Sequence, residues 1–176
     1  MWKNNGGWTI REVKLEDYQL VANVYNSNQS FLQNHLGVDI VDADFIADEV
    51  QSMKKIGFSP CIIVEDTRKI IGVLDYKYNE SNDVCKNEYS DECYLSLMML
   101  AKKYQEKGLG SEIYKTVETH LREEGCKSIR IDVVKDYKEN VMSFWRQLGF
   151  QACEEVKLTW GNKSSLAVVM RKVLEV

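Results

Sequence analysis

The chain has 176 residues, of which 44% are hydrophobic and 28% charged, a balance typical of one globular domain. Its formal net charge is −4, and because nucleic-acid-binding domains need a basic surface, we expect no nucleic acid among its partners. No apolar run approaches the length of a membrane span and the first residues lack an apolar signal segment, so we expect a cytoplasmic protein without membrane contact.

In the first half of the chain, the apolar pattern predicts two helices among several strands. The predicted elements are a strand at 8–13, a helix from 15 to about 26, a helix over about 44–55, and a hairpin of strands at 61–65 and 69–78. Residues 31–41 show no clear pattern, and the polar, acidic stretch 79–91 is predicted to be a loop.

In the second half of the chain, segments with the two-residue apolar period of strands alternate more regularly with segments that have the 3.6-residue period of helices. It predicts a strand at 94–101, a helix from 109 onward that ends before Gly125, a strand at 128–134, a helix at about 141–148 and two strands at 150–160 and 165–173. No repeat or proline-rich linker divides the chain, so we expect one domain over residues 1–176. The element order predicts a mixed α/β fold around one sheet.

The five cysteines are scattered, odd in number and without a C-x-x-C pair, which predicts idle thiols in a reducing cytosol and no metal site. They are Cys61, Cys85, Cys93, Cys126 and Cys153. The only histidines are His35 and His120, and the sequence pairs neither with a cysteine nucleophile.

A glycine loop joins the strand at 94–101 to the following helix. The first amides of a helix have no partner inside it and carry partial positive charge, so anions bind there. Gly108 and Gly110 remove side chains that would keep an anion away, and three lysines at 102, 103 and 107 add positive charge. The loop therefore predicts a phosphate site, although two glycines can also serve only to make a tight turn. It is neither a P-loop nor a dinucleotide fingerprint, since the remaining motif residues are absent.

This loop, Q-x-x-G-x-G between a strand and a helix, resembles the acetyl-CoA loop of the GNAT superfamily of N-acetyltransferases, [RQ]-x-x-G-x-[GA]. The element order is similar to that family's over essentially the whole chain. The resemblance implies a mixed, mostly antiparallel central sheet flanked by helices, with acetyl-CoA as co-substrate. It places the CoA pyrophosphate on the main chain of Gln105, Glu106, Lys107, Gly108, Leu109, Gly110 and Ser111, and the thioester near main-chain donors of Leu100 or Met98.

A second segment, from Asn140 to Phe150, resembles the family's N…(Y/W)-x-x-x-G-F pattern. The resemblance implies that Asn140 and Trp145 lie beside pantetheine, while helix capping by Asn140 and core packing of the aromatic residues remain alternatives. Many family members carry a tyrosine at the Trp145 position that protonates the leaving thiolate. An indole N–H is not acidic near neutral pH, so we expect no proton donor there.

The resemblance implies acetyl transfer to a primary amine by direct attack in a ternary complex. Ser96 occupies the position where the family often carries a glutamate base, and its hydroxyl could order a water. Glu92 at the strand entrance could accept a proton through water, or it is only a solvated loop carboxylate. Phe31, Tyr76 and Tyr94 are candidate aromatic walls for the amine.

Two other functions remain open at this point. One is an acyl-CoA-binding module of the same fold without catalysis, and the other is an interaction domain in which the glycine loop is a turn. A peptide or small-molecule amine is the expected partner, and the resemblance also suggests a homodimer.

Overall fold

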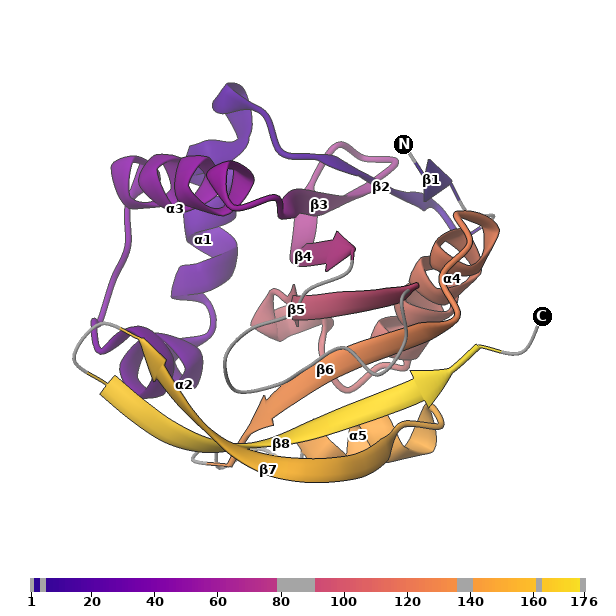
Figure 1. Ribbon diagram of the computed structural model, residues 1–176. Helices are drawn as coiled ribbons and strands as arrows, with labels where there is room; N and C mark the ends of the chain where they lie inside the picture. The colour runs from indigo at the N-terminus through magenta and orange to yellow at the C-terminus, as the bar shows by residue number, and fades with distance from the viewer. Residues whose placement is uncertain (1, 4–5, 79–90, 136–140, 161–162, 175–176) are drawn as a thin grey trace. The chain divides into compact units, whose positions relative to one another are not determined.

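The computed structural model describes residues 2–3, 6–78, 91–135, 141–160 and 163–174 (Figure 1). It divides into two compact units, one of residues 1–76 and 97–120 and the other of residues 77–96 and 121–176. Both units combine strands with helices, which confirms the predicted α/β class. Among the described residues, no helix is long and apolar enough to cross a membrane.

The first unit holds the chain's N-terminal strands and most of its helices. Its strands are β1 (Trp2–Lys3), β2 (Trp8–Glu12), β3 (Ser59–Glu65), β4 (Ile70–Tyr78) and the C-terminal half of β5 (Glu92–Leu100). Its helices are η1 (Leu15–Asp17), α1 (Tyr18–Asn26), α2 (Gln29–Phe31), η2 (Leu32–Leu36), α3 (Ala43–Lys55), η3 (Lys102–Tyr104) and most of α4 (Leu109–Glu123). The strands lie in the order β1-β2-β3-β4-β5, and β1 to β4 pair antiparallel.

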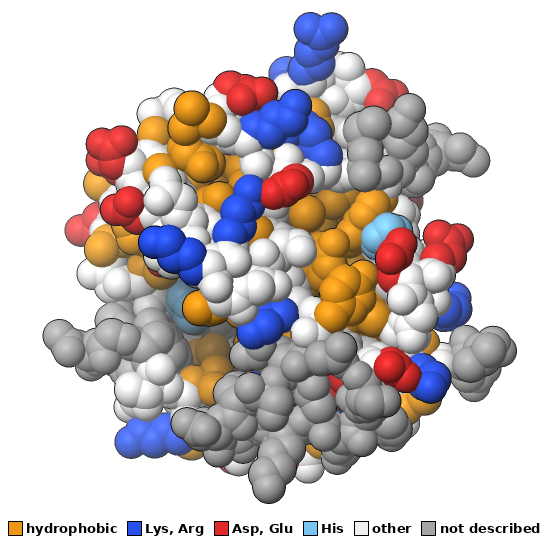
Figure 2. All heavy atoms as spheres, turned by 45° about the horizontal axis from the view of Figure 1, so that its top comes forward, with side chains coloured by type: hydrophobic (Ala, Val, Ile, Leu, Met, Phe, Trp, Pro, Cys, Tyr) orange, Lys and Arg blue, Asp and Glu red, His pale blue; other side chains and the backbone are white. Residues whose placement is uncertain are grey.

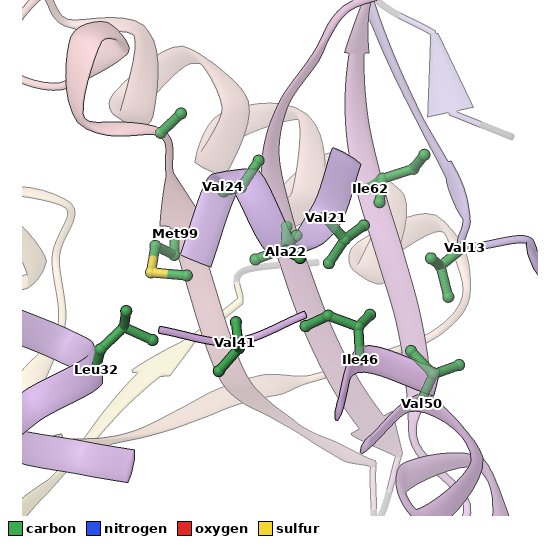
Figure 3. Packing of buried hydrophobic residues seen from close by; sticks show 12 residues of the cluster. Val13, Val21, Ala22, Val24, Leu32, Val41, Ile46, Val50, Ile62 and Met99 are labelled. Atoms are coloured by element: carbon green, nitrogen blue, oxygen red, sulfur yellow. The ribbon is translucent and has the colours of Figure 1, made fainter. Parts of the chain in front are cut away.

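Helices α1 and α3 lie side by side and bury their apolar stripes against β3, β4 and β5 (Figure 1). Figure 3 labels Val21 of α1, Ile46 of α3 and Ile62 of β3 among the residues of this core. Their spacing places one apolar face of each helix toward the strands, as the sequence pattern predicted. The Asp42 side chain caps α3 by accepting a hydrogen bond from the Phe45 amide at 2.9 Å.

Two parts of the first unit were not predicted. The two-residue strand β1 pairs with β2, and the stretch without a clear pattern forms α2 and the π-helical turn η2. That turn ends at Gly37, whose φ of 74° lies in the left-handed region that favours glycine. Tertiary contacts fix this stretch, because the Asn26 side chain both donates to the Val41 carbonyl and accepts from its amide.

The second unit contains the N-terminal half of β5, β6 (Ser128–Val134), α5 (Val141–Gln147), β7 (Gln151–Trp160) and β8 (Lys163–Val173). Its strand order is β5-β6-β8-β7. Strands β5 and β6 are parallel, whereas β6 and β8 and β7 and β8 are antiparallel. The predicted mixed, mostly antiparallel pairing is therefore confirmed. On the face drawn in Figure 2, the described acidic and basic side chains are interspersed.

Candidate active site

The join between β5 and α4 is a strand, a 3₁₀ turn, a loop and a helix; the sequence predicted the strand, the loop and the helix, but not the 3₁₀ turn. Gly108 precedes α4, and its carbonyl accepts hydrogen bonds from the Ser111 amide at 3.0 Å and the Glu112 amide at 3.3 Å. Gly108 therefore caps the helix with its main chain. Its φ of 79° and the φ of 62° at Glu106 show that two loop positions adopt left-handed backbone.

The surface over the glycine is open. Gly108 is exposed, and an added Cβ there would meet no atom within 4 Å. Lys102, Lys103 and Lys107 are also exposed, and the Lys107 ammonium donates to the Lys103 carbonyl at 2.8 Å. The main-chain amides at the start of the helix, the positive end of its dipole and these lysines together form a surface on which an anion can rest.

The Gln105 side chain turns into the protein beneath this loop. Its amide nitrogen donates to the Asn28 side-chain oxygen at 2.7 Å and to the Leu100 carbonyl at 2.8 Å. The motif's glutamine thus ties the loop to the end of β5 and to the end of α1. Its side chain positions the loop, and the main chain around it is what remains exposed.

Asn28 completes this network and was missed by the sequence analysis. It is 8% exposed, and its amide nitrogen donates to the Leu100 carbonyl at 3.1 Å and to the Val24 carbonyl at 2.9 Å. The neighbouring Ser27 hydroxyl accepts a hydrogen bond from the Lys102 amide at 3.1 Å. The only signal in the sequence was a short polar run at the end of a helix, which is typical of any loop.

Leu100 and Met98 occupy the end of β5, beside β4. Leu100 is buried, and the Ala101 amide that follows it donates to the Ile71 carbonyl of β4 at 2.8 Å. An added Cβ at Gly72 of β4 would lie 2.7 Å from the Leu100 side chain and 2.8 Å from the Met99 carbonyl oxygen. Glycine is therefore required at position 72 for this close approach, which fixes the strand end that precedes the loop.

Glu92 is a buried ion-pair partner, and its interpretation as a solvated loop carboxylate was wrong. It is 1% exposed and accepts hydrogen bonds from the Arg171 guanidinium at 2.9 Å and from the Ser128 hydroxyl at 3.1 Å. These contacts join β5 to β6 and β8. A carboxylate enclosed and neutralised in this way serves the fold, and the structure gives it no exposed oxygen for a water-mediated proton transfer.

Ser96 lies two residues beyond the end of the β5–β6 ladder. The ladder joins residues Glu92 to Tyr94 with Ser128 to Arg130, and β5 continues to Leu100. Among the described residues, the pairing of β5 with β6 thus ends at Tyr94. Ser96 is half-buried, at a place where a strand leaves its neighbour.

Tyr94 is held in a polar cluster of the second unit. Its ring lies under the Arg130 guanidinium at 4.2 Å, and Arg130 also pairs with Asp132 at 3.4 Å. Burial, and then the Asp132 charge, raise the pKa of Tyr94 well above its ordinary value. Its phenol therefore stays neutral over the physiological range.

The other two candidate aromatic walls, Phe31 and Tyr76, lie in the first unit and contact other aromatic rings there. Phe31 stacks on His35 at 4.9 Å and meets the ring of Tyr25 edge-on at 5.8 Å. Tyr76 instead packs against Trp2, at 5.4 Å between ring centroids.

Trp145 lies in an aromatic cluster on α5. It is 7% exposed, and its ring meets Phe144 and Phe150 edge-on at 5.0 and 5.2 Å. This packing supports the core alternative for Phe150, which is 2% exposed. Asn140, the other residue predicted to lie beside pantetheine, is outside the described residues.

A comparison with family models identifies the family. The model of the acetyltransferase (GNAT) family matches residues 23–150. A search of curated proteins found no match.

Solved structures of the same fold cover nearly the whole chain. An acetyl transferase from Salmonella typhimurium that modifies the N-terminal serine of ribosomal protein L7/L12 is 14% identical, with 97% of each chain covered and a TM-score of 0.76. An acetyltransferase from Thermus thermophilus is 16% identical over 95% of this chain and 97% of its own, with a TM-score of 0.72. The Salmonella typhimurium protein yncA, solved with its cofactor acetyl-CoA, is 18% identical over 97% and 95%, with a TM-score of 0.63.

Proposed function

Because this chain belongs to the GNAT family of acetyltransferases, we propose that it transfers an acetyl group from acetyl-CoA to a primary amine. The amine attacks the thioester carbonyl directly while both substrates are bound. The new bond joins nitrogen to the acetyl carbon, the carbon–sulfur bond breaks, the amine loses one proton and the CoA thiolate gains one. No acyl-enzyme forms in this scheme.

The proposal rests on one observation: the loop before α4 is open to solvent at the start of a helix, where a pyrophosphate could bind. Gly108 leaves open space above a helix start, and the Gln105 and Asn28 side chains fix the loop from beneath. The main-chain amides of residues 108–110, aided by the exposed lysines, would hold the pyrophosphate. Acetyl-CoA supplies the activated acetyl group, and the chain supplies its orientation.

Proton transfer is assigned to water rather than to a strong acid or base of the chain. Ser96 lies where β5 leaves β6, and its hydroxyl would order a water that takes the amine proton. The main chain of Leu100 or Met98 would stabilise the carbonyl oxygen as charge develops on it. Trp145 would pack beside pantetheine and leave protonation of the thiolate to solvent.

Release of free CoA thiol from acetyl-CoA, measured across a panel of primary amines, tests this function. We expect release that depends on the amine and yields the N-acetylated product, with saturation by both substrates. A panel covering alkylamines, amino acids, aminoglycosides and peptides that shows no product, while CoA binds, would contradict the proposed transfer.

The alternative is a GNAT module that binds acyl-CoA without catalysis. It is favoured by the tryptophan at the family's tyrosine position and by the buried ion pair of Glu92. Thiol release across the amine panel, together with thermal unfolding in the presence of CoA, separates the two functions. A binding module would be stabilised by CoA and would release no thiol with any amine.

A further inference from the structure

The second unit holds a carboxylate on the same face of its strands as Ser96. Tyr94 and Arg130 are directly opposite each other in the parallel ladder of β5 and β6, and their side chains are in contact. Side chains two positions apart on a strand point to the same face. Ser96 follows Tyr94 by two positions, and Asp132 follows Arg130 by two. Ser96 and Asp132 therefore lie on one face, directly after the point where the pairing of β5 with β6 ends.

The Asp132 carboxylate is enclosed by the protein without being hydrogen-bonded. Its side chain is 1% exposed, and the Arg130 Nε lies 3.4 Å from its Oδ1 and balances its charge. Among the described residues, neither carboxylate oxygen accepts a hydrogen bond. A buried carboxylate in this condition is unfavourable, and protein interiors commonly satisfy such groups with a bound water. The two oxygens thus favour a water beside Asp132.

Solvent reaches β6 at this position. Asp132 as a whole is half-buried although its side chain is enclosed, so its exposed surface is main chain. On its other side, β6 stays paired with β8 from Ser128 to Val134. The main chain of Asp132 is therefore exposed where β5 no longer pairs with it, and a water there can exchange with solvent.

We propose that Asp132 is the proton acceptor of the reaction and acts through the water held at Ser96. This inference rests on the proposed acetyl transfer. As the amine nitrogen bonds to the acetyl carbon, it becomes cationic and gives a proton to that water, which passes one of its own protons to an Asp132 oxygen. The carbon–sulfur bond breaks, and CoA leaves as a thiolate that solvent protonates. Asp132 then returns its proton to solvent, so it acts without touching the amine.

The groups that face Asp132 from three strands adjust its basicity. Burial raises the pKa of Asp132, and the charge of Arg130 on the same strand opposes this effect. The Tyr94 hydroxyl of β5 and the Arg171 charge of β8 also lower the pKa, whereas the Glu92 charge of β5 raises it. The net result is a pKa above the ordinary value of an aspartate. This makes the carboxylate a better proton acceptor, because a general base works best when its pKa approaches the working pH.

Initial rates of thiol release against pH test this role, with the amine of highest kcat/KM among the alkylamines, amino acids, aminoglycosides and peptides of the panel. At pH 7, Asp132→Asn should lower kcat by about 10²-fold or more, as expected for a lost general base, with CoA affinity unchanged in calorimetric titration. Above pH 7 hydroxide can replace the carboxylate, so the ratio of wild-type kcat to variant kcat should fall by up to about tenfold per pH unit. Ionisation of the amine affects both proteins alike. A ratio that stays constant from pH 7 to pH 9 would indicate a structural role and would overturn the proposal.

Glu92→Gln is the matched control, because it also removes a buried carboxylate that pairs with an arginine of these strands. It should lose stability and keep the pH profile of the wild type. Ser96→Ala should lower kcat by less than Asp132→Asn does. Because both side chains hold one water, Ser96→Ala should add little to the loss in Asp132→Asn. A full additional loss in the double variant would show that the two residues act separately, against the shared water.

Should Asp132→Asn fail to fold, Asp132→Glu decides. It keeps the charge beside Arg130 and moves the carboxylate by one methylene group, so kcat should fall by about tenfold to 10²-fold. An unchanged kcat in Asp132→Glu would overturn the proposal. A wild-type protein that acetylates no amine would refute the proposed transfer and this role with it. An active wild type with an equally active Asp132→Asn would refute this role alone.

Discussion

At the scale of single residues, Gly108 combines left-handed backbone with open space. In Gly108→Val, the side chain would project where a phosphate must approach, so we expect CoA affinity to fall by at least about tenfold, or about 1.4 kcal/mol. The positive φ should also cost at least about 1–2 kcal/mol of unfolding free energy. Calorimetric titration with CoA and urea denaturation measure the two effects.

Gly125 supplies a matched control for this substitution. It follows the other end of α4, with a φ of 91° and no atom within 4 Å of an added Cβ. Gly125→Val should lose similar stability and keep its CoA affinity. An equal loss of CoA affinity in both variants would show that strain, rather than obstruction of a phosphate site, weakens binding.

Asn28 is the residue whose side chain links α1, β5 and the glycine loop. Asn28→Asp keeps an acceptor for Gln105 and loses the two bonds that the amide donates to the Leu100 and Val24 carbonyls. We expect a loss of about 1–3 kcal/mol of unfolding free energy and, because the loop loosens, a fall in CoA affinity of several-fold. Urea denaturation and CoA titration measure both quantities.

Asn26→Asp is the control, since Asn26 is also bonded by its side chain, but to Val41. It should lose comparable stability with CoA affinity unchanged. If the two variants bind CoA equally well, Asn28 supports only the fold and has no positioning role.

At the scale of elements, the Glu92–Arg171 pair joins β5 to β8 across β6, which contributes Ser128. Glu92→Gln leaves the buried Arg171 guanidinium with only the more distant Glu154 carboxylate, at 3.9 Å, as counter-charge, which should cost up to about 3–5 kcal/mol. Turnover of the folded fraction should stay within about twofold of wild type, well short of the roughly 10²–10⁴-fold loss of a general base. Urea denaturation and initial rates measure these two effects.

The exposed pair of Lys135 with Glu155 on β7 gives the comparison. Glu155→Gln should change stability by no more than about 1 kcal/mol, because solvent screens surface pairs. A Glu92→Gln protein with wild-type stability and a 10³-fold loss of turnover would assign Glu92 to catalysis.

On α5, the Trp145 ring packs against Phe144 and Phe150 rather than standing free. Trp145→Phe keeps an aromatic ring there, so we expect turnover to fall by less than about tenfold, below the range expected for a lost general acid. Trp145→Ala should cost about 3–5 kcal/mol through the cavity it leaves. A 10³-fold lower kcat in Trp145→Phe, with CoA affinity and folding intact, would give the indole a catalytic role.

At the scale of the whole molecule, we propose that residues 1–176 unfold as one domain. Strand β5 passes from one compact unit to the other after Ser96, and α4 does so after His120. Unfolding one unit alone would therefore break a continuous strand and a continuous helix, which should couple the two units. Hydrogen exchange of β3 amides and of β8 amides should give the same maximal free energy of opening. A difference above about 2 kcal/mol would indicate two separately folding parts.

The sequence by itself determined most of the longer elements and the place of the loop. The change from a two-residue to a 3.6-residue apolar period marked the join of β5 and α4, and Gly108 marked the loop between them. Positions of this kind are encoded by neighbours in the chain, since periodicity and the need for left-handed backbone are local properties. The boundaries of β6, Ser128–Val134, were predicted without error for the same reason.

Only the tertiary structure decided which polar side chains meet. Gln105 and Asn28 lie 77 positions apart, and Glu92 and Arg171 lie 79 apart. Strand order and register bring such pairs together, and neither is visible in local periodicity. Register likewise places Ser96 of β5 and Asp132 of β6 on one face of their strands. The alternation of each strand predicted its two faces, and the register of the pairing determined which side chains met there.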